Sequence, residues 1–175
     1  MTVYLVSLRQ PTYTLMHYFL NIGSNLGNRK LNISRALRAI EEKFGYFEVS
    51  KIYESRPWGY DSDNEFANIA VMVVSDVAPA AMLDSLKEIE QRLNPTPHRT
   101  ADGGYADRVL DIDIMAADEA EISETCLTIP HPHLAERRFF LEPFRQLAPL
   151  WRHPRTGLTC AEMLEALPAE DSETE

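Results

Sequence analysis

The chain has 175 residues, a length typical of one domain, and its 45% hydrophobic and 25% charged residues are typical of a folded globular protein. Its 17 Lys and Arg against 27 Asp and Glu give a net charge of −10, which argues against a protein that wraps duplex nucleic acid or binds an anionic membrane surface. The two cysteines, Cys126 and Cys160, do not make a disulfide framework, and no apolar run approaches the roughly 20 residues of a transmembrane helix.

The two ends of the chain differ from its middle. Residues 1–15 precede the first predicted element and lack the features of a signal peptide, so we expect a cytoplasmic protein whose natural start is Met16. Residues 168–175 are acidic and lack bulky apolar side chains, which predicts a disordered tail. We therefore expect a single catalytic domain over residues 16–167.

The first half of this domain predicts a strand, a helix and two further strands. Residues 17–22 (HYFLNI) and 46–53 are typical of strands, and residues 66–75 (FANIAVMVVS) are apolar on both faces, as in a central strand. Residues 29–44 predict a helix, because apolar side chains recur at helical spacing and Gly45 follows as a C-cap.

The second half continues the alternation. A helix is predicted from Pro79 to Leu93 and a strand over residues 109–116, followed by irregular segments and a short last helix that begins with the capping box of Thr159 and Glu162. The order β-α-β-β-α-β predicts an α+β fold of the ferredoxin-like kind, an antiparallel sheet with helices packed on its faces. In this arrangement the two core helices share one face.

Two aspartates stand inside the strand predicted at 109–116. Side chains alternate along a strand, so Asp111 and Asp113 share one face, whereas Leu110, Ile112 and Ile114 point into the core. Neighbouring carboxylates repel each other and are typical of a magnesium site, in which phosphate oxygens complete the coordination. A solvated edge strand with two exposed acids is the alternative.

Other side chains are compatible with binding as well as with a structural role. Arg108 can serve the aspartates only if it precedes the regular strand, and it is otherwise a surface arginine. His131 and His133 could bind zinc or, as we favour, provide one phosphate contact or a turn. The turn at 23–28 could hold an anion at a helix N-terminus, although a structural turn is favoured.

Aromatic side chains flank the predicted central strand. Trp58 and Phe66, together with the amide of Asn68, would suit a flat heterocycle, and a plain aromatic core is the alternative.

Taken together, these segments resemble one family, the 6-hydroxymethyl-7,8-dihydropterin pyrophosphokinases of folate synthesis. The resemblance runs from about residue 18 to residue 167 and rests on the segments FLNIGSNLG (19–27), YESRPWG (53–59), FAN (66–68), RVLDIDI (108–114), LTIPH (127–131) and RRF (137–139).

The resemblance implies transfer of pyrophosphate from ATP to the hydroxymethyl group of the pterin, with release of AMP. It implies that Asp111 and Asp113 hold two Mg²⁺ ions. These two aspartates are expected to be catalytic, together with Arg108 and Arg99. ATP would be bound by Arg108, Ile114, His131 and Arg137. The pterin would be bound by Ser55, Trp58, Phe66, Asn68 and Phe139, with Phe66 and Phe139 on its two sides. The resemblance also implies a monomer, whereas the absence of nucleic-acid and membrane partners is expected from the net charge and the lack of a long apolar run.

The sequence departs from the family in three places. The family often has a Trp-Gly-Pro-Arg run and several arginines in the loop before the aspartates, where this chain has Tyr105, Ala106 and Asp107 before Arg108, and only Arg99 in the loop. In addition, Arg56 stands where a proline is common, and Pro132 stands where an aromatic is common. These departures concern closure over ATP.

Two other functions remain open at this point. One is a different magnesium-dependent nucleotidyl transferase that uses the same aspartate pair. The other is a ferredoxin-like ligand-binding module without catalysis, which would have no need for Asp111 and Asp113 on one face. Release of AMP that depends on both the pterin and magnesium separates them.

The expected start at Met16 can be checked directly. We predict that mass spectrometry of the endogenous protein finds Met16 or the residue after it at the N-terminus. Finding Met1 or Thr2 there would contradict this expectation.

Overall fold

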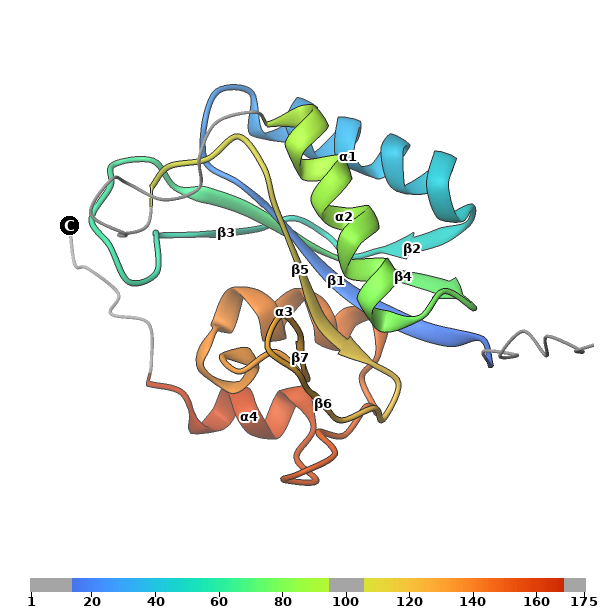
Figure 1. The fold of residues 1–175 in the computed structure, drawn as a ribbon. Helices are drawn as coiled ribbons and strands as arrows, with labels where there is room; N and C mark the ends of the chain where they lie inside the picture. The colour runs from blue at the N-terminus through green and yellow to red at the C-terminus, as the bar shows by residue number, and fades with distance from the viewer. Residues whose placement is uncertain (1–13, 95–105, 169–175) are drawn as a thin grey trace, which may run out of the picture.

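The computed structural model describes residues 14–94 and 106–168 (Figure 1). Its elements, in chain order, are β1 (Met16–Ser24), α1 (Arg29–Phe44), β2 (Phe47–Val49), β3 (Tyr53–Ser55), β4 (Phe66–Ser75), α2 (Pro79–Leu93), β5 (Asp111–Ala117), β6 (Ile122–Ser123), β7 (Thr128–Ile129), the 3-10 helix η1 (Leu134–Glu136), α3 (Arg138–Leu147) and α4 (Cys160–Ala166). The expectations for the N-terminal extension, for Arg99 and for nearly all of the acidic tail fall outside the described residues.

The main sheet is antiparallel and has the order β2-β4-β1-β5, with β3 also paired to β4. This is the strand order of a ferredoxin-like core, so the predicted fold class is confirmed. Helices α1 and α2 have the predicted bounds, and α4 begins at the predicted capping box of Thr159 and Glu162. Among the described residues no helix is both long and apolar enough to cross a bilayer.

The single strand predicted at 46–53 is wrong, because the chain forms two short strands there. Ser50 interrupts the ladder: its Oγ accepts a hydrogen bond from the backbone N–H of Ala70 at 2.9 Å, where a strand would offer a carbonyl. The next amide, that of Lys51, donates to the side chain of Gln146 in α3 and not to β4. The chain thus leaves the sheet after β2 and returns as β3.

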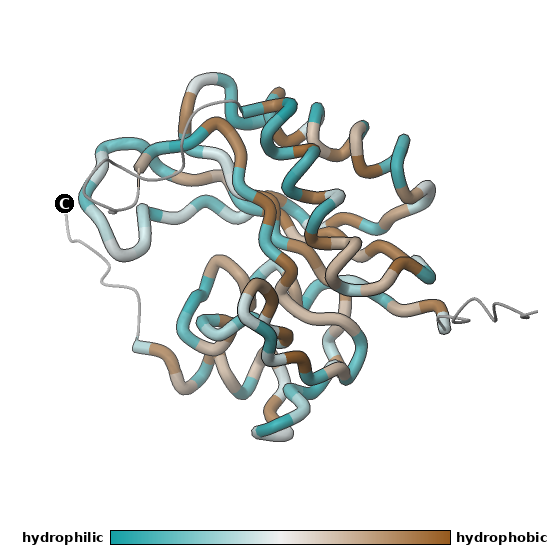
Figure 2. Tube along the Cα trace, in the orientation of Figure 1, coloured by the Kyte–Doolittle hydropathy of each residue, from teal (hydrophilic) through white to brown (hydrophobic). Residues whose placement is uncertain are grey.

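Each face of the sheet carries its own core. Tyr18, Leu20 and Ile22 of β1 are fully buried against α1 and α2, which cover one face. Phe19 lies on the other face, where α3 and α4 pack and where its ring lies 4.6 Å from that of Phe144. Figure 1 shows the two helix pairs on opposite sides of the sheet, and Figure 2 shows hydrophobic positions concentrated along the strands between them.

Strand β5 begins two residues later than predicted and contains a bulge opposite Phe19 and Leu20. The α3–α4 pair packs near the bulged end of the strands. Asn21, Gly23 and Asn68, at the other end of the same face, are therefore left to line a pocket.

Candidate active site

The floor of the pocket is formed by three neighbouring strands in fixed register. Gly23 of β1 pairs with Asn68 of β4 on one side and with Asp111 of β5 on the other. Because neighbouring strands lie about 4.8 Å apart, the amide of Asn68 and the carboxylate of Asp111 are held roughly 10 Å apart on the same face. The register thus places a neutral hydrogen-bonding wall opposite an acidic wall.

Gly23 keeps the space between these walls open. A Cβ atom at this position would lie 3.0 Å from Oδ1 of Asn68 and 3.4 Å from the ring of Phe66. A side chain would therefore crowd the Asn68 amide, which would have to shift, and would fill the space beside Phe66. The glycine is required here for close approach and not for a turn.

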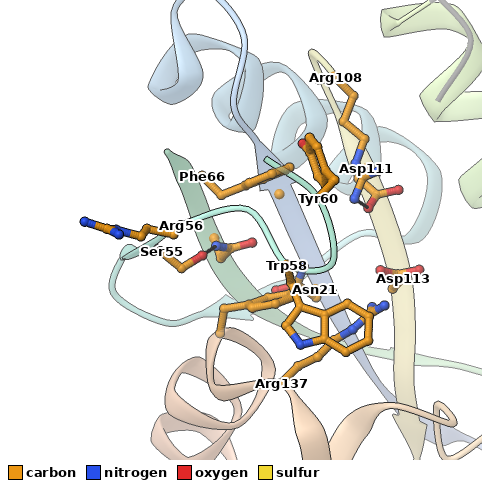
Figure 3. A pocket seen from close by; sticks show the side chains of 13 residues that line it. Asn21, Ser55, Arg56, Trp58, Tyr60, Phe66, Arg108, Asp111, Asp113 and Arg137 are labelled. Carbon is orange, nitrogen blue, oxygen red and sulfur yellow. Dashed lines mark hydrogen bonds and ion pairs between the residues drawn. The ribbon is translucent and has the colours of Figure 1, made fainter. Parts of the chain in front are cut away.

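Nine of the predicted site residues meet in this pocket (Figure 3). They include all five that the resemblance assigns to the pterin, and the full set is Ser55, Trp58, Phe66, Asn68, Arg108, Asp111, Asp113, Arg137 and Phe139. Asn68 is buried and donates a hydrogen bond from Nδ2 to Oγ of Ser55 at 3.0 Å, which fixes the orientation of the amide.

The aspartate pair has the predicted parity. Leu110, Ile112 and Ile114 are buried in the core beneath α1 and α2, and Asp111 and Asp113 line the pocket on the opposite face. Burial and the charge of Asp111 raise the pKa of Asp113 to about 7, despite the opposing field of Arg137. Two carboxylates in such proximity are poised to bind a cation.

Arg108 lies before β5, so strand parity does not turn it away from the site. Its Nη2 lies 2.9 Å from Oδ2 of Asp111, and its guanidinium carbon lies 5.3 Å from the ring centre of Phe66. Arg108 thus contacts both the aromatic ring of Phe66 and the carboxylate of Asp111.

Arg137 also lines the pocket and is only 8% exposed. Its guanidinium carbon lies 4.4 Å from the ring centre of Trp58 and 4.9 Å from that of Phe140, and its Nε has no hydrogen-bond partner in the described structure. Figure 3 shows the indole of Trp58 beside this guanidinium. A buried cation held by aromatic faces keeps its donors available for an anion.

His131 and Ile114, both assigned to ATP by the resemblance, line a second cavity. Its lining includes Cys126 and Thr128, and it shares Asp113 with the first pocket. The two cavities therefore meet at the acidic wall.

His131 is neutral in this environment. Burial, with the charges of Arg137 and His133, lowers its pKa to about 4. The backbone N–H of His133 donates to Nδ1 of His131 at 3.1 Å, so the ring proton is carried by Nε2, which is a donor.

A zinc site at the two histidines finds no support in residues 14–94 and 106–168, which contain no cluster of three metal-ligating side chains. His133 instead lies 2.8 Å from the carboxylate of Glu136.

Sequence reasoning missed Asn21 and Tyr60 as pocket residues. Asn21 is a polar residue in an apolar strand with the same parity as Gly23, which is a signal that could have found it. Its buried Oδ1 has no hydrogen-bond partner among the described residues. No such signal marks Tyr60, because it lies in a loop whose path the sequence does not specify.

Comparison with known proteins is consistent with this geometry. Residues 19–149 match the model of the family described as 7,8-dihydro-6-hydroxymethylpterin-pyrophosphokinase. The chain is 35% identical over 138 residues to a 2-amino-4-hydroxy-6-hydroxymethyldihydropteridine pyrophosphokinase of Porphyromonas gingivalis, covering 78% of this chain and 92% of the relative. A protein of the same name from Aquifex aeolicus is 30% identical over 136 residues, covering 78% and 82%.

A solved structure shares the fold. The HPPK-DHPS protein of Plasmodium falciparum superposes with a TM-score of 0.67 at 16% identity over 87% of this chain. The present chain spans 43% of that longer protein. On the match of the family model and the identity to these relatives, the chain belongs to the 7,8-dihydro-6-hydroxymethylpterin-pyrophosphokinase family.

Proposed function

We propose that this chain transfers pyrophosphate from ATP to the hydroxymethyl group of 6-hydroxymethyl-7,8-dihydropterin, releasing AMP, in folate biosynthesis. The observation that carries the proposal is the meeting of two cavities at Asp113. One has the aromatic and amide lining of a heterocycle site, and the other has the neutral histidine donor. The reacting groups of two substrates would meet between them.

The first pocket is the proposed pterin site. Phe66 and Phe139 would lie on the two faces of the ring system, and Asn68, held by Ser55, would hydrogen-bond its edge. The buried Oδ1 of Asn21 supplies an acceptor for an N–H group of the heterocycle. Trp58 would cover the ring at the mouth.

The second cavity is the proposed ATP site. Ile114 would contact the base, and the Nε2–H of His131 would donate to a phosphate oxygen. The guanidinium of Arg137, aimed into the first pocket, would bind a phosphate at the boundary. Arg99, outside the described residues, is proposed to close over the phosphates from the loop at 94–107.

Asp111 and Asp113 fit Mg²⁺. They offer only carboxylate oxygens, which suit a cation that takes one or two carboxylates and completes its shell with phosphate and water. We propose that they hold two such ions. When bound, the ions would neutralise phosphate charge and orient the pyrophosphoryl group.

The reaction needs no protein nucleophile. The hydroxyl oxygen of the pterin attacks the β-phosphorus of ATP. A new oxygen–phosphorus bond forms as the bond between the β-phosphorus and the α,β-bridging oxygen breaks. AMP leaves with the bridging oxygen, and the hydroxyl proton is released. Such transfers depend on positioning and on charge neutralisation. Arg108, 2.9 Å from Asp111, is placed to stabilise charge on the transferring group.

We also propose, on the resemblance, that the chain acts as a monomer. Two further proposals rest on the sequence pattern: residues 16–167 would form a single catalytic domain, and this domain would act in the cytoplasm.

We predict that purified protein releases AMP from ATP only when both magnesium and the hydroxymethyl pterin are present. Asp111→Ala and Asp113→Ala should lower kcat at least about 100-fold, because each removes a carboxylate that holds the phosphate-bound cation. The exposed Asp63, replaced by Ala, serves as the control. Full activity in either active-site variant would refute the metal assignment, and bound Mg-ATP without AMP release would favour a binding module.

Asp113 should limit the stability of the metal-free fold. A carboxyl whose pKa is raised in the folded state contributes stability below its unfolded pKa, and this contribution is lost as the pH rises through about 7. We predict that Asp113→Asn raises Tm at pH 8 in EDTA by at least about 2–4 °C. A gain of about 1 kcal/mol in the free energy of unfolding produces a Tm shift of this size in a chain of this length. The gain should vanish near pH 4. An equal gain at both pH values, or one matched by Asp63→Asn, would contradict the stated cause.

The location of ATP can be tested with the native cysteines. Cys126 is exposed in the second cavity, whereas Cys160 is buried and its pKa is raised to about 12, so a thiol reagent should label only Cys126. We predict that saturating Mg-ATP slows the labelling about tenfold or more. Cys126→Ser should abolish rapid labelling, and labelling that is unaffected by Mg-ATP would place the nucleotide elsewhere.

A further inference from the structure

The carboxylate of Asp107 gathers hydrogen bonds from segments far apart in the sequence. Its Oδ1 accepts from Nδ2 of Asn25 at 2.7 Å and from the hydroxyl of Tyr60 at 3.1 Å. Its Oδ2 accepts from Oγ of Ser62 at 2.8 Å and from Nδ2 of Asn64 at 2.6 Å. Three of these donors belong to the loop between β3 and β4, at residues 56–65.

Asn25 extends the network to Arg108. The Oδ1 of Asn25 accepts from the backbone N–H of Arg108 at 2.8 Å, and the backbone N–H of Asn25 donates to the carbonyl of Arg108 at 3.1 Å. The side chain of the buried Asn25 thus accepts from Arg108 through Oδ1 and donates to Asp107 through Nδ2, which defines the orientation of its amide. The backbone of Arg108 is therefore held from both sides.

The ionised state of the Asp107 carboxylate supports this network. Burial works to raise the pKa of Asp107, but the four side-chain donors outweigh it and hold the pKa below its usual range. Burial and hydrogen bonding to Asp107 raise the pKa of Tyr60 to about 12, so its phenol keeps the proton that it donates. Hydrogen bonds to an ionised acceptor are the strong ones.

We propose that Asp107 is a positioning residue that fastens the 56–65 loop over the pterin pocket and fixes Arg108 against Asp111. The loop carries Trp58 and Tyr60, both of which line the pocket, and Asp107 touches neither the pocket nor the reacting atoms. Asp107 stands where the family resemblance leads us to expect proline, which has no side-chain acceptor.

The catalytic part of this inference rests on the proposed function, whereas the fastening of the loop does not. A loop that is already held in place loses less conformational entropy when substrate binds. An arginine in a fixed position keeps its charge beside the transferring group. Removing Asp107 should thus raise the KM for the pterin and lower kcat. The KM for ATP should rise less than that for the pterin, because the loosened Arg108 is only one of its proposed contacts, and His131 and Ile114 lie in the second cavity.

The fluorescence of Trp58 reports whether the 56–65 loop is held in place, without any substrate. The chain has two tryptophans, so Trp151→Phe leaves Trp58 as the only one. In this background we expect Asp107→Ala to increase acrylamide quenching of Trp58, which is 36% exposed and stacked on Arg137 when the loop is fastened. Asp107→Asn, which retains one acceptor, should give a smaller increase.

Controls separate the network from charge and from general unfolding. Asp63→Asn makes the same charge change on the 56–65 loop itself, at an exposed side chain for which no hydrogen bond is seen among the described residues. Ser62→Ala removes one donor that does not line the pterin pocket. If Asp107 and Ser62 act together, Asp107→Asn and Ser62→Ala will be non-additive in quenching. Circular dichroism verifies that each variant is folded.

The expected result is increased quenching in Asp107→Ala together with a fall of about tenfold in kcat/KM for the pterin. A fall of this size corresponds to the loss of one hydrogen bond to a charged group. Unchanged quenching in folded Asp107→Ala and Asp107→Asn would overturn the fastening, whatever the activity. An equal effect of Asp63→Asn would overturn it as well. If no variant, including the wild type, releases AMP, the proposed function fails and the quenching still decides the role of Asp107.

Discussion

The site depends on the register of three antiparallel strands. Because Gly23 of β1 pairs with Asn68 of β4 and with Asp111 of β5, one face of the sheet holds an amide wall and an acidic wall at a fixed separation. The core on the opposite face sets this register, since a slip of one residue would turn Leu20 and Ile22 away from α1 and α2. Packing on one face thus specifies chemistry on the other.

Much of the fold was predictable because its signals are local. Helical spacing gave the bounds of α1 and α2, and strand alternation gave the shared face of Asp111 and Asp113. The split at Ser50 was not predictable, since it depends on a side chain that meets Ala70 only after β4 has paired. The place of Arg108 followed from where β5 begins, which strand periodicity leaves uncertain by a few residues.

The candidate site was predictable to the extent that motifs marked it. The segments quoted for the family resemblance contain twelve of the residues that line one pocket, and nine of these had been assigned to the site. By contrast, Asp107 bonds to partners 43 to 82 residues away in the chain, and no periodicity or spacing connects them. A residue that replaces the family's usual one carries no motif, so its role becomes visible only with the loop in place.

The interruption at Ser50 has a consequence for the edges of the sheet. An edge strand with a row of free backbone groups invites pairing with another chain, but β2 and β3 are three residues each, and the chain between them turns to the side chain of Gln146. At the opposite edge, Met115 of β5 accepts a hydrogen bond from the backbone of His131, and Ile112 donates to the side chain of Glu90. One margin is thus short and interrupted and the other is partly occupied from within, so the sheet offers little for strand-by-strand growth between molecules.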